Sequence, residues 1–306
     1  MFAQWVDALG VGDGTGERFP VDSANPRGLH ERKDVVEFND RWLRELGGAW
    51  WAPPRVWEQT WRALNQEQLA EDRAQFEYFD AEFNDWYVKD PRLSLILPLW
   101  DRLALQRLPV VIGLREPREV AMSLNVRSGI TLRRGLALWL AYNRSLFTHL
   151  GGRHSLVVDT NSAFQDPYRA VVEVAMFCES SGVSIDTTAV NVVAEGIEPG
   201  LLRNHTHKLG RSAERLAADV DETYHALARR HLQPDSDAPE SIPMPDWASE
   251  ALEELTEVWE LQAKVEMLQE IADFREQELK RIYNRLPRRA ARAVVPKRLR
   301  SDSATD

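Results

Sequence analysis

An arginine and a serine eight residues apart form the best anion-binding pattern in this chain. Arg115 and Ser123 follow the apolar segment 108–114, whose length and composition are typical of a buried strand. Pro117 suits the first turn of a helix, so Arg115 would stand where the strand ends and the helix begins, with Ser123 two turns further on. Because a helix N-terminus and an arginine both attract phosphate oxygens, the sequence predicts a nucleotide-binding site here.

This stretch resembles the site that holds the 3'-phosphate of the donor nucleotide in bacterial sulfotransferases. Residues 25–31, Asn-Pro-Arg-Gly-Leu-His-Glu, resemble a second segment of that family, and residues 86–92, which end in Lys-Asp-Pro-Arg, resemble a third. With residues 136–144 and a later strand ending at Asp159, the resemblance covers about residues 5–210. It implies an α/β fold with a P-loop-type, mostly parallel sheet flanked by helices.

The resemblance also implies an activity. The enzyme would transfer a sulfuryl group from 3'-phosphoadenosine 5'-phosphosulfate (PAPS) to a hydroxyl or amine acceptor, without a metal ion. Like phosphoryl transfer, this reaction depends on positioning, on charge stabilisation and on removal of the acceptor proton.

Three side chains become candidates for the chemistry. Glu31 is the first candidate for the base, since burial can raise the pKa of a carboxyl group towards neutrality, and His30 is the alternative because imidazole titrates near neutral pH. Lys89 would stabilise charge on the transferred group at the end of a strand. Its structural alternative is an ion pair with Glu31 or Asp90.

Four side chains become candidates for holding the donor. They are Arg115 and Ser123, Arg92 at the start of the next helix, and Arg203, which falls where relatives carry a basic segment. Pairing of Arg92 with an acidic neighbour is the alternative to a ligand contact. Asp159 is expected to orient a loop. Solvated helix surfaces are expected for Arg118, Arg127, Arg133 and Arg134.

One part of the family pattern is missing from the sequence. Relatives open with a strand and a loop rich in Gly, Ser and Thr that holds the 5'-phosphosulfate, whereas residues 1–9 here have the character of the helix after that loop. The glycine-rich segment 10–16 fits neither a dinucleotide fingerprint nor a Walker loop, and we interpret it as a surface turn. We expect either that the native protein begins upstream of Met1 or that this chain is a degenerate member.

Composition predicts a globular cytoplasmic protein. The net charge of -10 argues against nucleic-acid binding by the body of the chain. No segment is apolar enough for a membrane span, and the N-terminus lacks the features of a signal peptide. The single cysteine, Cys178, lies on an apolar helical face, which favours packing over a nucleophilic or metal-binding role.

Periodicity predicts strands at residues 85–89, 109–114 and 154–159, each followed by a helical segment. The clearest helix is expected from about Leu132 to Leu150, and an amphipathic helix from about Leu209 to His231 closes the sulfotransferase-like domain, residues 1–232.

The remaining residues change in character. Residues 233–248 are rich in proline and predict a linker, whereas residues 249–286 carry apolar side chains at coiled-coil spacing, interrupted at Arg275. This pattern predicts a homodimer, a partner helix, or a helix folded back on its own domain. The basic tail, residues 287–306, is expected to be disordered or to contact anionic lipid weakly.

Three functions stay open: an active PAPS-dependent sulfotransferase, an inactive sulfotransferase-like scaffold, and another P-loop transferase such as a small-molecule kinase. The acceptor would be a small molecule or a polysaccharide. Bacterial relatives favour carbohydrate, and the 11 tryptophans could stack on sugar rings, although core packing is their usual role.

Overall fold

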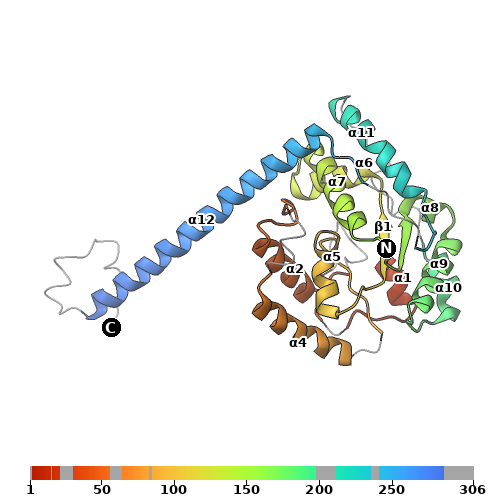
Figure 1. Ribbon diagram of the computed structural model, residues 1–306, viewed down its shortest axis with the longest axis horizontal. Coiled ribbons are helices and arrows are strands. Elements are labelled where there is room, and N and C mark those ends of the chain that lie inside the picture. The colour runs from red at the N-terminus through yellow and green to blue at the C-terminus, as the bar shows by residue number, and fades with distance from the viewer. Residues whose placement is uncertain are drawn as a thin grey trace. The chain divides into compact units, whose positions relative to one another are not determined.

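The computed structural model describes most of the chain (Figure 1). The described residues are 2–14, 16–20, 30–55, 64–82, 85–197, 211–235 and 241–285. Their elements, in chain order, are α1 (Phe2–Ala8), α2 (Lys33–Glu45), α4 (Gln66–Glu82), α5 (Leu93–Ala104), β1 (Val110–Leu114), α6 (Pro117–Ser128), α7 (Leu132–Thr148), β2 (Ser155–Asp159), α8 (Thr160–Gln165), α9 (Pro167–Ser180), the 3-10 helix η1 (Thr187–Ala189), α10 (Val190–Glu195), α11 (Arg211–Ala228) and α12 (Asp246–Arg285).

Two short parallel strands form the sheet of the described residues. β1 pairs with β2 in a register that sets Val110 beside Ser155 and Leu114 beside Asp159. On the other side of β2, the backbone N–H of Leu232 donates to the carbonyl of Val157 (2.8 Å), and Val157 forms an isolated parallel bridge with His231. The strands predicted at 109–114 and 154–159 are confirmed within one residue. The fold is mixed α/β and mostly helical.

The strand predicted at residues 85–89 is wrong. Only Trp86 makes a bridge, with Gly12, and the N–H of Tyr87 donates to the carbonyl of Gly12 (3.0 Å). A strand needs a neighbour that accepts and donates along several residues. Here the adjacent chain is a turn between α1 and Arg18, which supplies one pairing position. The apolar residues of this segment are therefore positioned by packing.

Helices cover both faces of the sheet. Leu156 and Val158 of β2 pack in one apolar cluster with residues of α1, α9 and α10. Val157, whose side chain points the other way, packs in a second cluster with α7, α11 and the start of α12. The continuous apolar sequence of β2 reflects burial on both faces.

A third apolar cluster lies among α2, α4 and α5. It contains Trp42 and Trp100, with Trp50 and Trp86 packed against it. Asn39 of α2 connects the cluster's polar groups, because its amide donates to Asp90 (2.9 Å) and its oxygen accepts from the Trp100 indole (2.9 Å). These four tryptophans therefore take the core role that was the alternative to sugar stacking.

The helices next to the predicted nucleotide site begin as the sequence indicates. α6 starts at Pro117, and the carboxylate of Glu116 caps it by accepting from the N–H of Glu119 (2.9 Å). Thr131 caps α7, which ends two residues before the predicted Leu150.

The first compact unit extends to Thr256, beyond the expected boundary at residue 232. Ile242 is buried in the second cluster, and so are Ala248 and Ala251 of α12. Arg133 of α7 binds Glu254 (2.7 Å), and Arg134 binds the same carboxylate (3.2 Å). Apolar burial and ion pairs thus draw the predicted linker and the first turns of α12 into the domain.

The second unit begins at Glu257. Its described part, up to Arg285, is the rest of α12, so a helix is present where coiled-coil spacing was found. The basic tail, residues 287–306, lies outside the described residues. None of the helices in the described ranges combines the length and the apolar character needed to cross a membrane.

Candidate nucleotide-binding and transfer site

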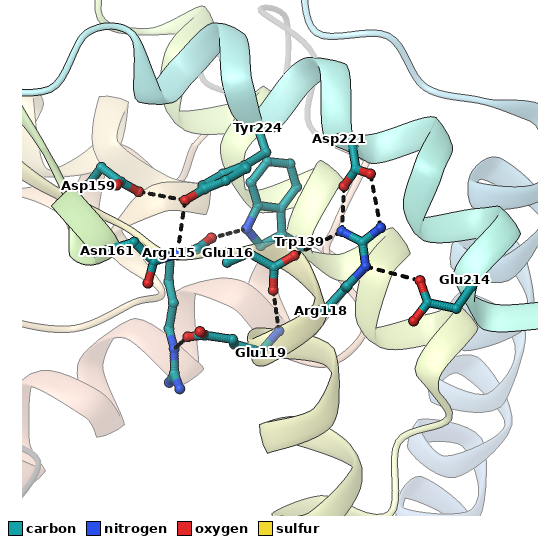
Figure 2. A network of polar contacts seen from close by, with 10 residues as sticks. All are labelled: Arg115, Glu116, Arg118, Glu119, Trp139, Asp159, Asn161, Glu214, Asp221 and Tyr224. Atoms are coloured by element: carbon teal, nitrogen blue, oxygen red, sulfur yellow. Dashed lines mark hydrogen bonds and ion pairs between the residues drawn. The ribbon is translucent and has the colours of Figure 1, made fainter. Parts of the chain in front are cut away.

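Arg115 stands at the end of β1, between the strand and α6 (Figure 2). Its carbonyl accepts a hydrogen bond from the indole of Trp139 (2.9 Å), which lies on α7. The next residue, Glu116, is the N-cap of α6. The backbone around Arg115 is therefore fixed from two helices, at the strand end where ligands of parallel sheets bind.

The Arg115 side chain is held by one nitrogen only. Its Nε donates to Oε2 of Glu119 (3.0 Å), whose side chain is 3% exposed, whereas that of Arg115 is 34% exposed. Within the described part of the chain, the two terminal nitrogens of Arg115 donate no hydrogen bond. Ser123 follows Glu119 by one helical turn and is half-buried on the same side of α6. Whether Arg115 and Ser123 bind one phosphate together stays a prediction.

Arg118 differs from its expected place on a solvated surface. Its guanidinium binds both oxygens of Asp221 on α11 (2.5 and 2.9 Å) and also contacts Glu214 (3.3 Å) and Glu116 (3.1 Å), as Figure 2 shows. The hydrogen bonds that Arg118 donates to Asp221 are the main reason why the pKa of Arg118 lies above its ordinary value. Arg118 ties α6 to α11 and is fully engaged.

A polar group that the sequence did not reveal lies at the end of β2. The hydroxyl of Tyr224 donates to Asp159 (2.9 Å), and the amide of Asn161 contacts the same hydroxyl (3.3 Å; Figure 2). Burial, followed by the nearby Asp159 carboxylate, raises the pKa of Tyr224. Oδ1 of Asn161 is buried without a hydrogen-bond partner among the described residues. A residue from α11 brings this group together, so sequence spacing could not have found it.

Asp159 orients its loop, as expected. Its Oδ2 accepts from the N–H of Ser162 (2.8 Å) and from the hydroxyl of the same residue (2.7 Å), which caps α8.

Glu31 and Lys89 meet although they lie 58 residues apart in the chain. The Lys89 ammonium donates to Oε1 of Glu31 in a short ion pair. The Glu31 side chain is 11% exposed and that of Lys89 is 34% exposed. The structure thus contains the ion pair that was the structural alternative for Lys89, and it places both proposed transfer residues in one position.

His30 lies on the other side of the same segment. Its backbone has a φ of 52°, and its Nδ1 is 3.4 Å from a terminal nitrogen of Arg18. Because a guanidinium only donates, this contact uses the lone pair of Nδ1. Asp7 is 3.9 Å away, beyond hydrogen-bonding distance. This contact makes His30 a weaker candidate for the base than Glu31.

The glycine-rich segment is packed, in contrast to the expected surface turn. Val11 and Asp13 are buried, and Arg18 donates to both oxygens of Asp13 (2.7 Å each) and to Asp7 (2.8 Å). Arg32 donates to the Asp13 carbonyl (2.6 Å). A buried carboxylate repels phosphate, so the described part of this segment does not form a phosphate cradle.

Arg92 is occupied by protein carboxylates. Its Nε donates to Asp40 (2.6 Å) and its Nη1 to Asp90 (3.1 Å), while its N–H also donates to Asp90 (2.9 Å). Burial opposes its charge, yet Asp90 and then Asp40 raise the pKa of Arg92 above its ordinary value. Pairing with acidic neighbours, the structural alternative for Arg92, is what the structure contains.

Helix α7 connects the two groups of candidate residues. Trp139 contacts the backbone of Arg115, and Tyr142, one turn later, is close enough to Arg92 and Glu31 for their charges to act on its hydroxyl. Burial is the main reason why the pKa of Tyr142 is raised.

The other candidates add little to this site. Arg203 lies outside the described residues. Cys178 is buried, and burial raises the pKa of its thiol to about 11, which does not suit a nucleophile. The described ranges contain no cluster of three or more His, Cys, Asp or Glu side chains placed to hold a metal ion.

Comparison of the chain with protein-family models, with curated proteins and with solved structures finds no match in any of the three.

Proposed function

We propose that this protein binds a 3'-phosphorylated adenine nucleotide and acts as a PAPS-dependent sulfotransferase. The observation that carries the proposal is the position of Arg115: it ends a parallel strand, precedes a helix that contains Ser123, and keeps two terminal nitrogens without partners among the described residues. A fork of two N–H groups matches the oxygens of a phosphate monoester, and we propose that the Ser123 hydroxyl adds a third hydrogen bond.

The described residues fit the 3'-phosphate of the donor better than its 5'-phosphosulfate. Arg115 and Ser123 would hold the 3'-phosphate, and the unpartnered Oδ1 of Asn161 offers an acceptor for a hydroxyl or amino group of the nucleoside. The segment around Asp13 does not fit the 5'-phosphosulfate, because its buried carboxylate already binds Arg18.

In the proposed reaction, the Glu31–Lys89 pair acts as a unit. The acceptor hydroxyl or amine attacks sulfur while the bond from sulfur to the phosphate oxygen of the donor breaks. Glu31 takes the acceptor proton, and Lys89 turns towards the departing oxygen, whose negative charge grows as the bond breaks. The products are the sulfated acceptor and 3'-phosphoadenosine 5'-phosphate (PAP).

A second function, nucleotide binding without transfer, is favoured by one observation. Arg18 forms ion pairs with Asp7 and Asp13 beside the glycine-rich segment. The described part of that segment therefore offers no loop that could bind the phosphosulfate. A scaffold of this kind would retain the Arg115 site and lack turnover.

Calorimetric titration with PAP tests the nucleotide site. We expect saturable binding that Arg115→Ala weakens by about tenfold or more, equal to about 1.5 kcal/mol for a lost charged hydrogen bond. Arg127→Ala, which removes an exposed arginine from the same helix, is the control and should bind normally. Equal affinity of all three folded proteins, or no binding by any of them, would contradict the proposal.

Turnover separates the two functions. PAP release from PAPS in the presence of hydroxyl or amine acceptors, beginning with carbohydrates, should fall at least ~100-fold in Lys89→Met while PAP affinity is retained. Lys33→Met removes an exposed lysine paired with Glu17 and should leave the rate unchanged. PAP binding without release from PAPS under any condition would select the scaffold function.

A further inference from the structure

Within the second unit, the described part of α12 carries a row of exposed apolar side chains. Val258, Leu261, Val265, Leu268, Leu279 and Ile282 are each about half exposed or more; Leu261, for example, is 65% exposed. Ala272 and Arg275 complete the row. Its successive members are alternately three and four residues apart, which places them all on one face of the helix. We call these eight positions the seam.

A row of this length needs a partner helix, because a solvated helix does not retain so many exposed large apolar residues without cost. The seam positions are also arranged symmetrically about residue 270. Val258 and Ile282 are equidistant from this centre, and so are Leu261 and Leu279.

We propose that the seam is an interface between two copies of this chain, whose α12 helices pack antiparallel around residue 270. Val258 of one copy then faces Ile282 of the other, and Leu261 faces Leu279. Ala272 faces Leu268, so that the smallest seam residue meets a large one.

Charges beside the seam favour the antiparallel direction. Lys264 directly precedes the seam residue Val265, and Glu278 directly precedes Leu279, so both charges lie on the same flank of the seam. In the antiparallel register, Lys264 of one copy lies opposite Glu278 of the other. The two-fold symmetry gives this pair twice per dimer. Glu278 also accepts from Arg281 of its own helix (2.6 Å), an exposed pair that is worth little and leaves the carboxylate accessible.

An apolar group on that flank is centred on the same point. Met267, Ile271 and Phe274 follow one another at helical spacing and are all exposed, at 52%, 43% and 62%. In the antiparallel dimer, Ile271 meets Ile271 of the second copy beside the two-fold axis, with Met267 near Phe274.

A parallel dimer uses the same residues less well. It sets Arg275 against Arg275 in the seam, leaves Ala272 facing Ala272, and places Ile271 opposite Glu276. Like charges that face each other are unfavourable, and two facing alanines leave the layer underfilled. In the antiparallel register Arg275 faces Val265, over which its aliphatic stem can lie while its charge reaches water.

Disulfide trapping in the full chain distinguishes the arrangements. In a Cys178→Ala background, Leu261→Cys and Leu279→Cys are made as separate variants. We expect the intermolecular disulfide only when the two variants are mixed, because residue 261 faces residue 279. Cross-linking of either variant alone would indicate a parallel dimer and overturn the proposal. Ala263→Cys, on the outer face, is the negative control against Leu279→Cys.

A charge exchange tests the register without cysteines. Sedimentation equilibrium of the full chain should show a dimer that Lys264→Glu weakens about fivefold or more. Lys264→Glu combined with Glu278→Lys should restore the original affinity, since the two pairs are re-formed with opposite polarity. A monomer at tens of micromolar, or no restoration by the double variant, would overturn the proposal and leave a different partner helix as the occupant.

Discussion

The ion pairs that each candidate residue makes distinguish Arg115 from Arg92. The Arg92 guanidinium donates hydrogen bonds to Asp40 and Asp90, whereas the Arg115 guanidinium donates only from Nε, to Glu119. Both arginines carry the same charge, but the sequence already offered pairing with an acidic neighbour as the alternative for Arg92. The guanidinium of Arg92 binds two carboxylates, whereas that of Arg115 binds one. Of these two arginines, Arg115 is the one whose terminal nitrogens have no hydrogen-bond partner among the described residues.

A half-buried histidine predicts how stability depends on pH. His231 accepts the backbone N–H of Asp159 at Nδ1 (3.0 Å), so the folded state requires the unprotonated nitrogen. Burial lowers the pKa of His231, and Asp159 opposes the shift only in part. The unfolded chain therefore binds the proton more readily, and the stability that neutral His231 contributes is lost as pH falls below about 6.5.

The expected result is a difference between two pH profiles. Urea unfolding of the natural chain should lose about 1 kcal/mol more between pH 7.5 and pH 5 than that of His231→Asn, which keeps an acceptor but cannot titrate. Parallel profiles for the two proteins would show that His231 protonates equally in both states.

Among the elements, the contact between α6 and α7 positions the site. At Gly135 of α7, a Cβ would lie 2.9 Å from Cα of Ala121 on α6, so the helices approach closely only because this residue is glycine. Trp139, one turn later, reaches the carbonyl of Arg115 from that position. The distance between two helices thus decides where the strand end, and with it Arg115, is held.

Gly135→Ala should destabilise the fold by about 1–3 kcal/mol, since the added methyl group meets backbone atoms. Helix propensity alone predicts the opposite, a gain of about 1 kcal/mol. Gly151→Ala is the matched control, because a Cβ there meets nothing within 4 Å, and its effect should stay within about 0.5 kcal/mol. Thermal and urea unfolding measure both changes, and a stabilised Gly135→Ala would mean that the helices are further apart.

For the whole molecule, α12 crosses the division at Thr256 between the two compact units. α12 continues through this point as one helix, yet its first turns are buried with the domain while its later residues are exposed. A single element therefore serves two units. The proposed dimer seam begins at Val258, directly after the last buried residue of α12, Leu255.

Truncation should reveal this division. A chain ending at Thr256 should unfold at the same urea concentration as the full chain and sediment as a monomer. A chain ending at residue 240 loses buried Ile242, Ala248, Ala251 and Leu255, and should be destabilised by several kcal/mol at about 1–3 kcal/mol for each larger side chain. Unfolding of the 256-residue chain would show that the seam also supports the domain.

The sequence by itself determined the elements whose signals are local. The apolar run before Arg115 and the periodicity of α7 predicted a strand and a helix within two residues of their bounds, and Pro117 indicated where α6 begins. These signals work because strand burial, capping and helical periodicity act over a few neighbouring residues. The joint role of Arg115 and Ser123 in binding an anion stays a prediction.

Tertiary structure alone decided which charged groups meet and which segments find neighbours. Residues 85–89 had a strand-like composition but only one pairing position beside them, and the proline-rich segment contained an isoleucine that the core could bury. Lys89 and Glu31, or Tyr224 and Asp159, pair across 58 and 65 residues. Such contacts depend on how distant elements pack. An ion pair or a buried hydrogen bond stabilises the fold only when packing brings its two partners together in an environment of low dielectric constant.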